Sequence, residues 1–271
     1  MGNLSQEQIA SFGEFVKKHG HFIIIGHKEP DGDCMASSLG VSYILDHFGK
    51  EYLLLNAGPF KRSEVKRFAP LFKQELPFMS EQDRKETGLI IVDCSERSRL
   101  GDELKEGLEG LDCFIIDHHK TACAGDAASI IDPAAPAAAL LVQQLYEGLV
   151  GIPDTEKAKT LFFGLMTDTG FFRYLGTGDA DVFRAAARLV EAGSNPRESY
   201  QEMTGGKSWN TRKLLGIILD RAERHLAGKL VISWETQEDT KKYGQDGRDS
   251  DAFYSLMLAV EGVEAVVFVM Q

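Results

Sequence analysis

Four short apolar runs recur along the first half of the chain, separated by amphipathic stretches. They cover residues 22–25, 52–55, 89–92 and 113–116, are rich in β-branched or aromatic residues, and are bounded by glycine or polar residues. Continuous apolar runs of this length are typical of parallel strands that are buried on both faces. After the first run, residues 35–48 place apolar side chains on roughly one helical face. The pattern predicts a βαβ unit and an α/β fold with a doubly wound parallel sheet.

The second half of the chain changes to helical spacing and then to a mixed pattern. Leu140, Leu141, Leu145 and Leu149 recur as on one face of a helix, and helical patterns continue to about residue 192. A polar, glycine-bearing segment at 193–207 predicts a linker. Beyond it we expect a helix around 210–224, a strand at 230–234, a helix near 252–259 and a strand at 263–269. The chain thus divides into a domain at 1–192, a linker at 193–207 and a smaller α/β lobe at 208–271.

Composition places the chain among ordinary soluble proteins. Of its 271 residues, 43% are hydrophobic and 26% are charged. The sequence contains no apolar run approaching the roughly 18 residues of a membrane span, and its first residues lack the pattern of a signal peptide. We therefore expect a cytoplasmic protein without a membrane partner. The net charge of −11 argues against coating of long duplex nucleic acid but leaves a nucleotide substrate open.

The four cysteines, Cys34, Cys94, Cys113 and Cys123, form no C-x-x-C pair, which argues against a zinc knuckle or redox motif. Free cysteine is often buried, so we expect the four cysteines to act as small buried apolar residues. Cys34 and Cys94 lie next to residues that we assign below to a candidate site, so oxidation there would harm it.

Acidic and imidazole side chains follow three of the four predicted strands. His27, Asp31 and Asp33 follow the first strand, Asp93 follows the third, and Asp117-His118-His119 follows the fourth. Ligands of open parallel sheets bind beyond the carboxyl ends of the strands. Singly, each residue has an ordinary explanation, because Asp-Gly-Asp is common in turns and Asp93 could cap a helix. Together, they indicate one site.

The residue types in this set suit divalent cations. Imidazole favours ions such as Mn²⁺, Fe²⁺ or Zn²⁺, and carboxylate favours Mg²⁺ and Mn²⁺. Two ions about 3.5–4 Å apart can activate water at neutral pH and clamp the oxygens of a phosphoryl group. The pattern therefore predicts metal-assisted phosphoester hydrolysis without a serine nucleophile.

Four motifs occur in order and resemble the DHH family of phosphoesterases. Residues 27–33 match the form His-x-x-Pro-Asp-Gly-Asp, Asp93 follows an apolar strand, Asp117-His118-His119 is the triplet that names the family, and residues 164–171 carry Asp168 at a predicted helix end. The match spans about residues 22–175. It implies a DHH catalytic domain followed by part of the associated substrate-binding domain.

The resemblance also implies individual roles. His27 and Asp31 would hold one ion, Asp33, His118 and Asp168 would hold a second, and Asp93 would bridge both. The ions would be two Mn²⁺, with Mg²⁺ or Co²⁺ as alternatives. His119 would contact the scissile phosphate or the leaving oxygen, as a catalytic and substrate-binding residue. Asp117, also counted as catalytic, would orient a ligand histidine.

Motif spacing and length are most similar to the bacterial nano-oligoribonuclease and pAp phosphatase group of this family. This implies hydrolysis of short oligoribonucleotides, of 3′-phosphoadenosine-5′-phosphate (pAp), or of both, so the expected partner is a short RNA or nucleotide. A homodimer is a further expectation. The alternatives are a cyclic-dinucleotide phosphodiesterase and a catalytically impaired nucleotide-binding protein. A manganese pyrophosphatase is disfavoured, because the nearest match to its Ser-Arg-Lys-Lys segment is Thr211-Arg212-Lys213 in a predicted helix.

Two positions depart from the family pattern. The Gly-rich loop with its substrate-gripping histidine does not follow residue 269, so we expect the second lobe to be partial and substrate grip to be weak. The family usually has Ser-Thr at the start of the helix after the fourth strand, where this chain has Ala137-Ala138-Ala139. We expect metal binding to survive both departures.

Overall fold

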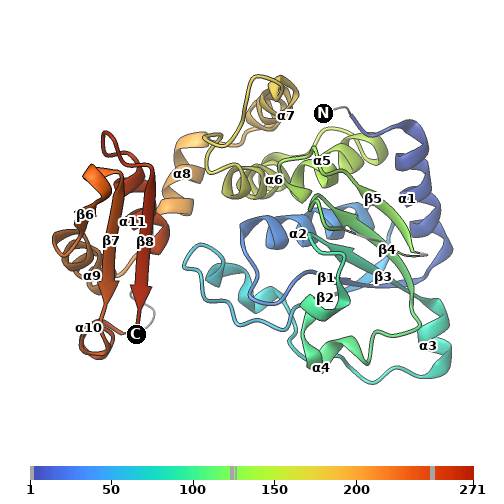
Figure 1. Ribbon diagram of the computed structural model, residues 1–271. Coiled ribbons are helices and arrows are strands. Elements are labelled where there is room, and N and C mark those ends of the chain that lie inside the picture. The colour runs from blue at the N-terminus through green and yellow to red at the C-terminus, as the bar shows by residue number, and fades with distance from the viewer. Residues whose placement is uncertain (1–2, 123–124, 126, 245–247) are drawn as a thin grey trace. The chain divides into compact units, whose positions relative to one another are not determined.

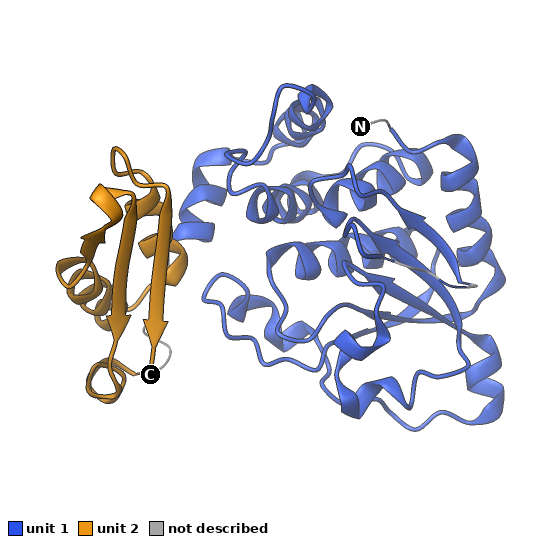
Figure 2. Ribbon diagram, in the orientation of Figure 1, with its two compact units in different colours: residues 1–205 blue, residues 206–271 orange. Residues whose placement is uncertain are grey.

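The computed structural model describes residues 3–122, 125, 127–244 and 248–271. The chain forms two compact units, residues 1–205 and residues 206–271 (Figures 1 and 2). In the described part of the chain, no helix is long and apolar enough to cross a membrane.

A five-stranded parallel sheet forms the centre of the first unit. Its strands run in the order β2-β1-β3-β4-β5. Their bounds are β1 His21–Ile25, β2 Glu51–Leu55, β3 Thr87–Val92, β4 Asp112–Asp117 and β5 Ala128–Ile131. The chain order reverses direction between β1 and β3, which makes the edge beyond these two strands the expected ligand position. The predicted α/β fold with a doubly wound parallel sheet is confirmed.

Helices and irregular segments cover the two faces of this sheet (Figure 1). One face packs against α1 Gln6–Lys18, α2 Gly32–His47, α5 Ala138–Leu149 and α6 Thr155–Asp168, in a core that includes Phe22, Ile24, Ile90 and Phe114. The other face packs against η2 Arg97–Leu100 and α4 Asp102–Lys105, through Ile23, Ile25 and Ile91. The remaining elements of this unit are η1 Lys66–Leu71, α3 Glu81–Glu86, α7 Ala180–Glu191 and α8 Pro196–Thr204. Since successive strand residues face opposite sides, burial on both faces explains the continuous apolar runs.

The four strands and the helix expected in the first half of the chain are present, with bounds shifted by a few residues. Helix α1 and strand β5 were not predicted. The segment 193–207, expected to be a linker, contains helix α8, which begins at Pro196 behind an Asn195 cap and belongs to the first unit. The unit boundary therefore falls after this helix, at Gly205.

The second unit is a small α/β fold. Its sheet has the order β6-β7-β8, with β6 antiparallel and β8 parallel to β7. The bounds are α9 Trp209–Asp220, β6 Glu223–His225, η3 Leu226–Gly228, β7 Leu230–Glu235, α10 Gln237–Tyr243, α11 Ser250–Leu258 and β8 Ala265–Met270. Leu214, Phe253 and Phe268 anchor its core. The two helices and two strands expected here are present, and β6 and α10 were missed.

Three of the four cysteines lie in the described residues. Cys34, Cys94 and Cys113 are free and buried, as predicted. Cys123 lies outside the described residues.

Small residues let α6 approach α2 and α5 closely. A Cβ atom on Gly164 would lie 2.6 Å from Ala36 Cβ and 2.7 Å from Ala139 Cβ. We expect Gly164→Ala to push α6 outward and to lower the free energy of unfolding by about 1–3 kcal/mol. Divalent metal should also bind more weakly, since α6 carries Asp168 one turn later. Denaturant unfolding and Mn²⁺ titration measure the two effects.

Gly216 in α9 provides the control, because a Cβ atom there would meet nothing within 4 Å. Gly216→Ala should therefore preserve metal affinity and raise helix stability by up to about 1 kcal/mol. Equal metal affinity in the Gly164→Ala variant and the unaltered protein would show that α6 does not position Asp168 through this contact.

Candidate metal centre

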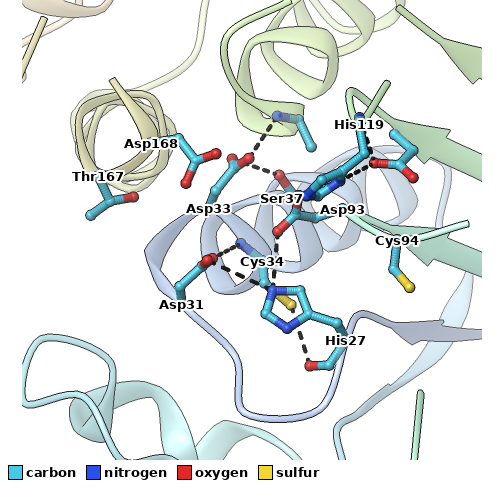
Figure 3. A network of polar contacts seen from close by, with 12 residues as sticks. His27, Asp31, Asp33, Cys34, Ser37, Asp93, Cys94, His119, Thr167 and Asp168 are labelled. Atoms are coloured by element: carbon cyan, nitrogen blue, oxygen red, sulfur yellow. Dashed lines mark hydrogen bonds and ion pairs between the residues drawn. The ribbon is translucent and has the colours of Figure 1, made fainter. Parts of the chain in front are cut away.

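The strand register brings three candidate residues to one level of the sheet edge. Ile25 pairs with Ile91, so His27 and Asp93 leave their strands side by side. Val92 pairs with Ile116, which places Asp93 beside Asp117 on its other flank. Figure 3 shows His27, Asp31, Asp33, Asp93 and Asp168 converging beyond this edge. Parallel pairing thus assembles residues that are up to 141 positions apart, from His27 to Asp168.

One ring nitrogen of His27 is fixed by the backbone, and the other faces carboxylates. Nδ1 lies 2.8 Å from the carbonyl oxygen of Lys28, to which it donates. Nε2 then lies 3.4 Å from Asp93 Oδ2 and 3.7 Å from Asp31 Oδ2. Asp31 caps helix α2 by accepting from the backbone N–H of Cys34 at 3.1 Å. Asp31, for which a turn was the ordinary alternative, is thus a helix cap, and its second carboxylate oxygen faces the cluster.

His118 repeats this arrangement from the neighbouring strand. Its Nδ1 lies 3.2 Å from the carbonyl oxygen of Ala135. Its Nε2 lies 3.3 Å from Asp93 Oδ1 and 3.3 Å from Asp168 Oδ2. Asp33 Oδ2 is 3.7 Å away from the same nitrogen. A backbone carbonyl that fixes the ring in this way leaves Nε2 as the nitrogen that could bind a metal.

Asp93 lies between the two histidines, with one carboxylate oxygen towards each. Oδ2 faces His27 and Oδ1 faces His118. The backbone of Asp93 has φ of 55°, in the left-handed region that non-glycine residues rarely adopt. Such a conformation costs about 1–3 kcal/mol and is typical of functional positions. Its N–H donates to the carbonyl of Ile116 at 2.9 Å, which holds the residue at the edge of β4.

The fully buried carboxylate of Asp33 is held by the start of helix α5. It accepts from the backbone N–H groups of Ala138 at 2.6 Å and Ala139 at 2.7 Å. Ser37 Oγ donates to it at 3.3 Å. Ala137 caps α5 without a side-chain bond, so Asp33 satisfies helix donors from another element. The departure at Ala137-Ala138-Ala139 changes side chains, while the backbone donors remain.

Asp117 contacts a different histidine from the one expected. Its buried Oδ1 accepts from His119 Nδ1 at 2.7 Å and from the backbone N–H of His118 and His119 at 2.8 and 3.1 Å. The ring of His118 is instead held by the Ala135 carbonyl. Asp117 therefore orients the partly exposed His119, not the candidate ligand His118, through Nδ1 and not through Nε2. The spacing of the triplet could not distinguish these two cases.

The donor set fits divalent cations. Asp93 Oδ1 and His118 Nε2 are buried and lack a hydrogen-bond partner, although buried polar atoms are normally satisfied. Two groups of metal-ligand atoms meet here, His118 with Asp33 and Asp168, and His27 with Asp93 and Cys34. A third group joins Asp93 with His118 and His119. Five of the six predicted ligands lie in these groups, and the sixth, Asp31, lies 3.7 Å from His27 Nε2, whereas Cys34 was not a predicted ligand.

The pKa values of His27, His118 and Asp33 also indicate that this cluster of carboxylates favours a positive charge. Burial lowers the pKa of His27, but Asp31 and Asp93 outweigh it and raise that pKa to about 10. Burial also lowers the pKa of His118, but the hydrogen bonds to Asp168 and Asp93 outweigh it and raise that pKa to about 11. Burial first, and then the charges of Asp93 and Asp168, raises the pKa of Asp33. A cation among these carboxylates would relieve their repulsion.

Metal binding should depend on pH because these imidazoles must lose a proton. Below the raised pKa values of His27 and His118, each metal-free ring carries two protons, and Nε2 cannot ligate. We therefore expect Mn²⁺ affinity to increase as pH rises and binding near neutral pH to release about two protons. Calorimetric titration in buffers of different ionisation enthalpy counts these protons. Binding that is independent of pH between 6 and 8 would contradict the assignment of these nitrogens.

The chain is similar to known proteins over most of its length. The DHH family, N-terminal domain, matches residues 21–166, which is more than half of the chain. The bifunctional oligoribonuclease and PAP phosphatase NrnA of Thermus thermophilus is 31% identical over 252 residues, covering 92% of this chain and 72% of that protein. The manganese-dependent inorganic pyrophosphatase of Methanocaldococcus jannaschii is 26% identical over 195 residues, covering 68% of this chain and 60% of that protein.

Among solved structures, an exopolyphosphatase-related protein from Bacteroides fragilis superimposes with a TM-score of 0.82 at 21% identity, covering 96% of this chain and 78% of that one. This likeness supports the fold. The family match, the 31% identical relative and the converging motif residues lead to one conclusion: the chain belongs to the DHH family.

Proposed function

We propose that this protein is a two-metal phosphoesterase that hydrolyses short oligoribonucleotides and pAp. The observation that carries this proposal is the position of Asp93, whose two carboxylate oxygens face two separate imidazole and carboxylate groups. A carboxylate shared by two ions would keep them close enough to clamp the oxygens of an in-line phosphoryl displacement. The substrate class is supported by the relative from Thermus thermophilus, which is an oligoribonuclease and PAP phosphatase.

The proposed ligand sets follow the contacts. His27 and Asp31 would hold one ion, His118, Asp168 and Asp33 would hold the other, and Asp93 would contribute to both. Mn²⁺ is the proposed metal, since mixed imidazole and carboxylate sets suit it and the pyrophosphatase relative is manganese-dependent. When bound, the ions supply Lewis acidity that lowers the pKa of water and neutralises charge on phosphate oxygens.

His119 is the proposed proton donor to the leaving oxygen. The hydrogen bond from Nδ1 to Asp117 fixes the ring orientation. Nε2 is then the nitrogen that contacts substrate. Burial of the Asp117 carboxylate under three N–H donors keeps this pair rigid.

A substrate panel tests the proposal. Metal-free protein, reconstituted with Mn²⁺, should hydrolyse a ribodinucleotide and pAp, with lower kcat/KM for a cyclic dinucleotide and for pyrophosphate. Pyrophosphate is included because one relative is a pyrophosphatase. Arg212, in the string nearest to the pyrophosphatase segment, is paired with Asp249 at 2.8 Å, which disfavours this substrate. Failure to hydrolyse any of the four with Mn²⁺, Mg²⁺ or Co²⁺ would exclude the proposed activity. Faster turnover of pyrophosphate than of the ribodinucleotide and pAp would show that the substrate is a phosphoanhydride and not a phosphoester.

A further inference from the structure

One buried thiol lies within the metal-ligand cluster, although the catalytic proposal does not use it. Cys34 follows Asp33 in helix α2 and is fully buried. Its Sγ, a ring nitrogen of His27 and a carboxylate oxygen of Asp93 lie within 4.8 Å of one another. Figure 3 shows the sulfur beside the His27 ring.

The backbone leaves room for this sulfur. A Cβ atom on Gly26 would lie 2.2 Å from Cys34 Sγ, so any larger residue at position 26 would displace it. The thiol contacts the His27 carbonyl at 3.9 Å, which is a long and weak interaction for an S–H donor. Geometry therefore places the sulfur near His27 without a strong bond that would compete with a cation.

We propose that Cys34 Sγ binds thiophilic divalent cations such as Zn²⁺ or Cd²⁺, together with His27 and Asp93. Thiolate is a soft ligand that favours these ions over Mn²⁺ and Mg²⁺. As the sulfur–metal bond forms, the thiol proton is released to solvent. The His27 side of the centre thus accepts hard ions through carboxylates and soft ions through sulfur. This inference rests on the proposed metal centre.

Cys94 provides a matched internal control. It is also fully buried and follows Asp93 directly, yet its Sγ donates to the carbonyl of Glu96 at 3.3 Å. Within the described ranges, Cys94 belongs to none of the groups whose atoms could share an ion. Figure 3 shows its sulfur directed away from the carboxylates.

Cd²⁺ titration of the metal-free protein tests the proposal, because a thiolate–Cd²⁺ bond gives a charge-transfer band in the ultraviolet. The band should appear in the unaltered protein and in a Cys94→Ser/Cys113→Ser/Cys123→Ser variant, which retains only Cys34. The band should disappear in Cys34→Ser and Cys34→Ala, and the affinity of these variants for Cd²⁺ should be at least about tenfold weaker. Mn²⁺ affinity should stay close to that of the unaltered protein.

Several outcomes would overturn the proposal. One is Cd²⁺ binding to the unaltered protein without a charge-transfer band. Another is a band of equal strength in the Cys34→Ser and Cys34→Ala variants, which would place the thiolate elsewhere. The unaltered protein decides the first outcome even if a variant does not fold. Normal Mn²⁺ binding with no Cd²⁺ band rejects the thiolate role alone, whereas failure to bind either ion also rejects the metal centre.

Discussion

Replacing Asp93 by Asn is expected to lower metal-dependent hydrolysis by roughly 10³-fold or more and to leave at most one divalent ion bound. The two oxygens of Asp93 face different imidazoles, at 3.4 Å from His27 Nε2 and 3.3 Å from His118 Nε2. The amide of Asn has one oxygen and no charge, so it can serve at most one ion. Steady-state kinetics and metal analysis after gel filtration measure both effects.

Asn is a better substitution than Ala at this position because of the backbone. Asp93 has φ of 55°, and Asn tolerates left-handed conformations where Ala is strained. The fold of Asp93→Asn should therefore be preserved. Without metal the variant should be less stable than the unaltered protein near neutral pH, because the loss of repulsion on Asp33 is accompanied by loss of the ion pairs that raise the pKa values of His27 and His118. Mn²⁺ at 100 times its Kd should stabilise the unaltered protein by about 2.7 kcal/mol per site.

Calorimetry distinguishes the possible results for this variant. A smaller Mn²⁺-dependent rise in Tm than in the unaltered protein, with normal unfolding of the metal-free form, supports a bridging role. Two bound equivalents and near-normal kcat would show that Asp93 does not bridge two ions.

The sheet could be predicted from sequence because its strands are buried on both faces. Residues 22–25 and 89–92 are continuous apolar runs, and the structure buries all eight. Strand β5 was missed because it is a short edge strand whose Ala128 and Ser129 are exposed. Helix α1 was missed although Ser5 and Gln8 form a capping box, which is a recognisable signal. The segment 193–207 was expected to be a linker, and the helix α8 within it was missed although its Asn195-Pro196 pair is a typical helix start.

The location of the site followed from the rule that parallel strands present ligands at their carboxyl ends. The roles of individual residues did not, because they depend on contacts between distant segments. Asp33 accepts from Ala138, 105 positions away, and His118 is oriented by Ala135. Cys34 was predicted to be an ordinary buried residue, and only the three-dimensional position of its sulfur relates it to His27.

Replacing each of the two adjacent histidines is expected to have a large effect on a different property, turnover for His119 and metal content for His118. His119→Ala should lower kcat by roughly 10²–10⁴-fold with two ions retained, because its Nδ1 is bound to Asp117 at 2.7 Å and lies farther, at 3.8 Å, from Asp93 Oδ1. His118→Ala should instead lose the ion shared with Asp33 and Asp168, since its Nε2 faces those carboxylates. Metal analysis and kinetics on the same samples separate the two.

The exposed His47, at the end of helix α2, supplies the control, and His47→Ala should retain both activity and metal.

If the role of His119 is proton donation, its loss should matter less for an ester with an acidic leaving group, such as a nitrophenyl ester, because a good leaving group needs little protonation. Asp117→Asn should lie between His119→Ala and the unaltered protein, since the amide oxygen can still accept from Nδ1 but only one oxygen of the side chain remains to hold the ring and the two backbone N–H groups. Equal losses on nitrophenyl and dinucleotide esters would assign His119 to phosphate binding, and loss of metal from His119→Ala would show that the two histidines have exchanged roles.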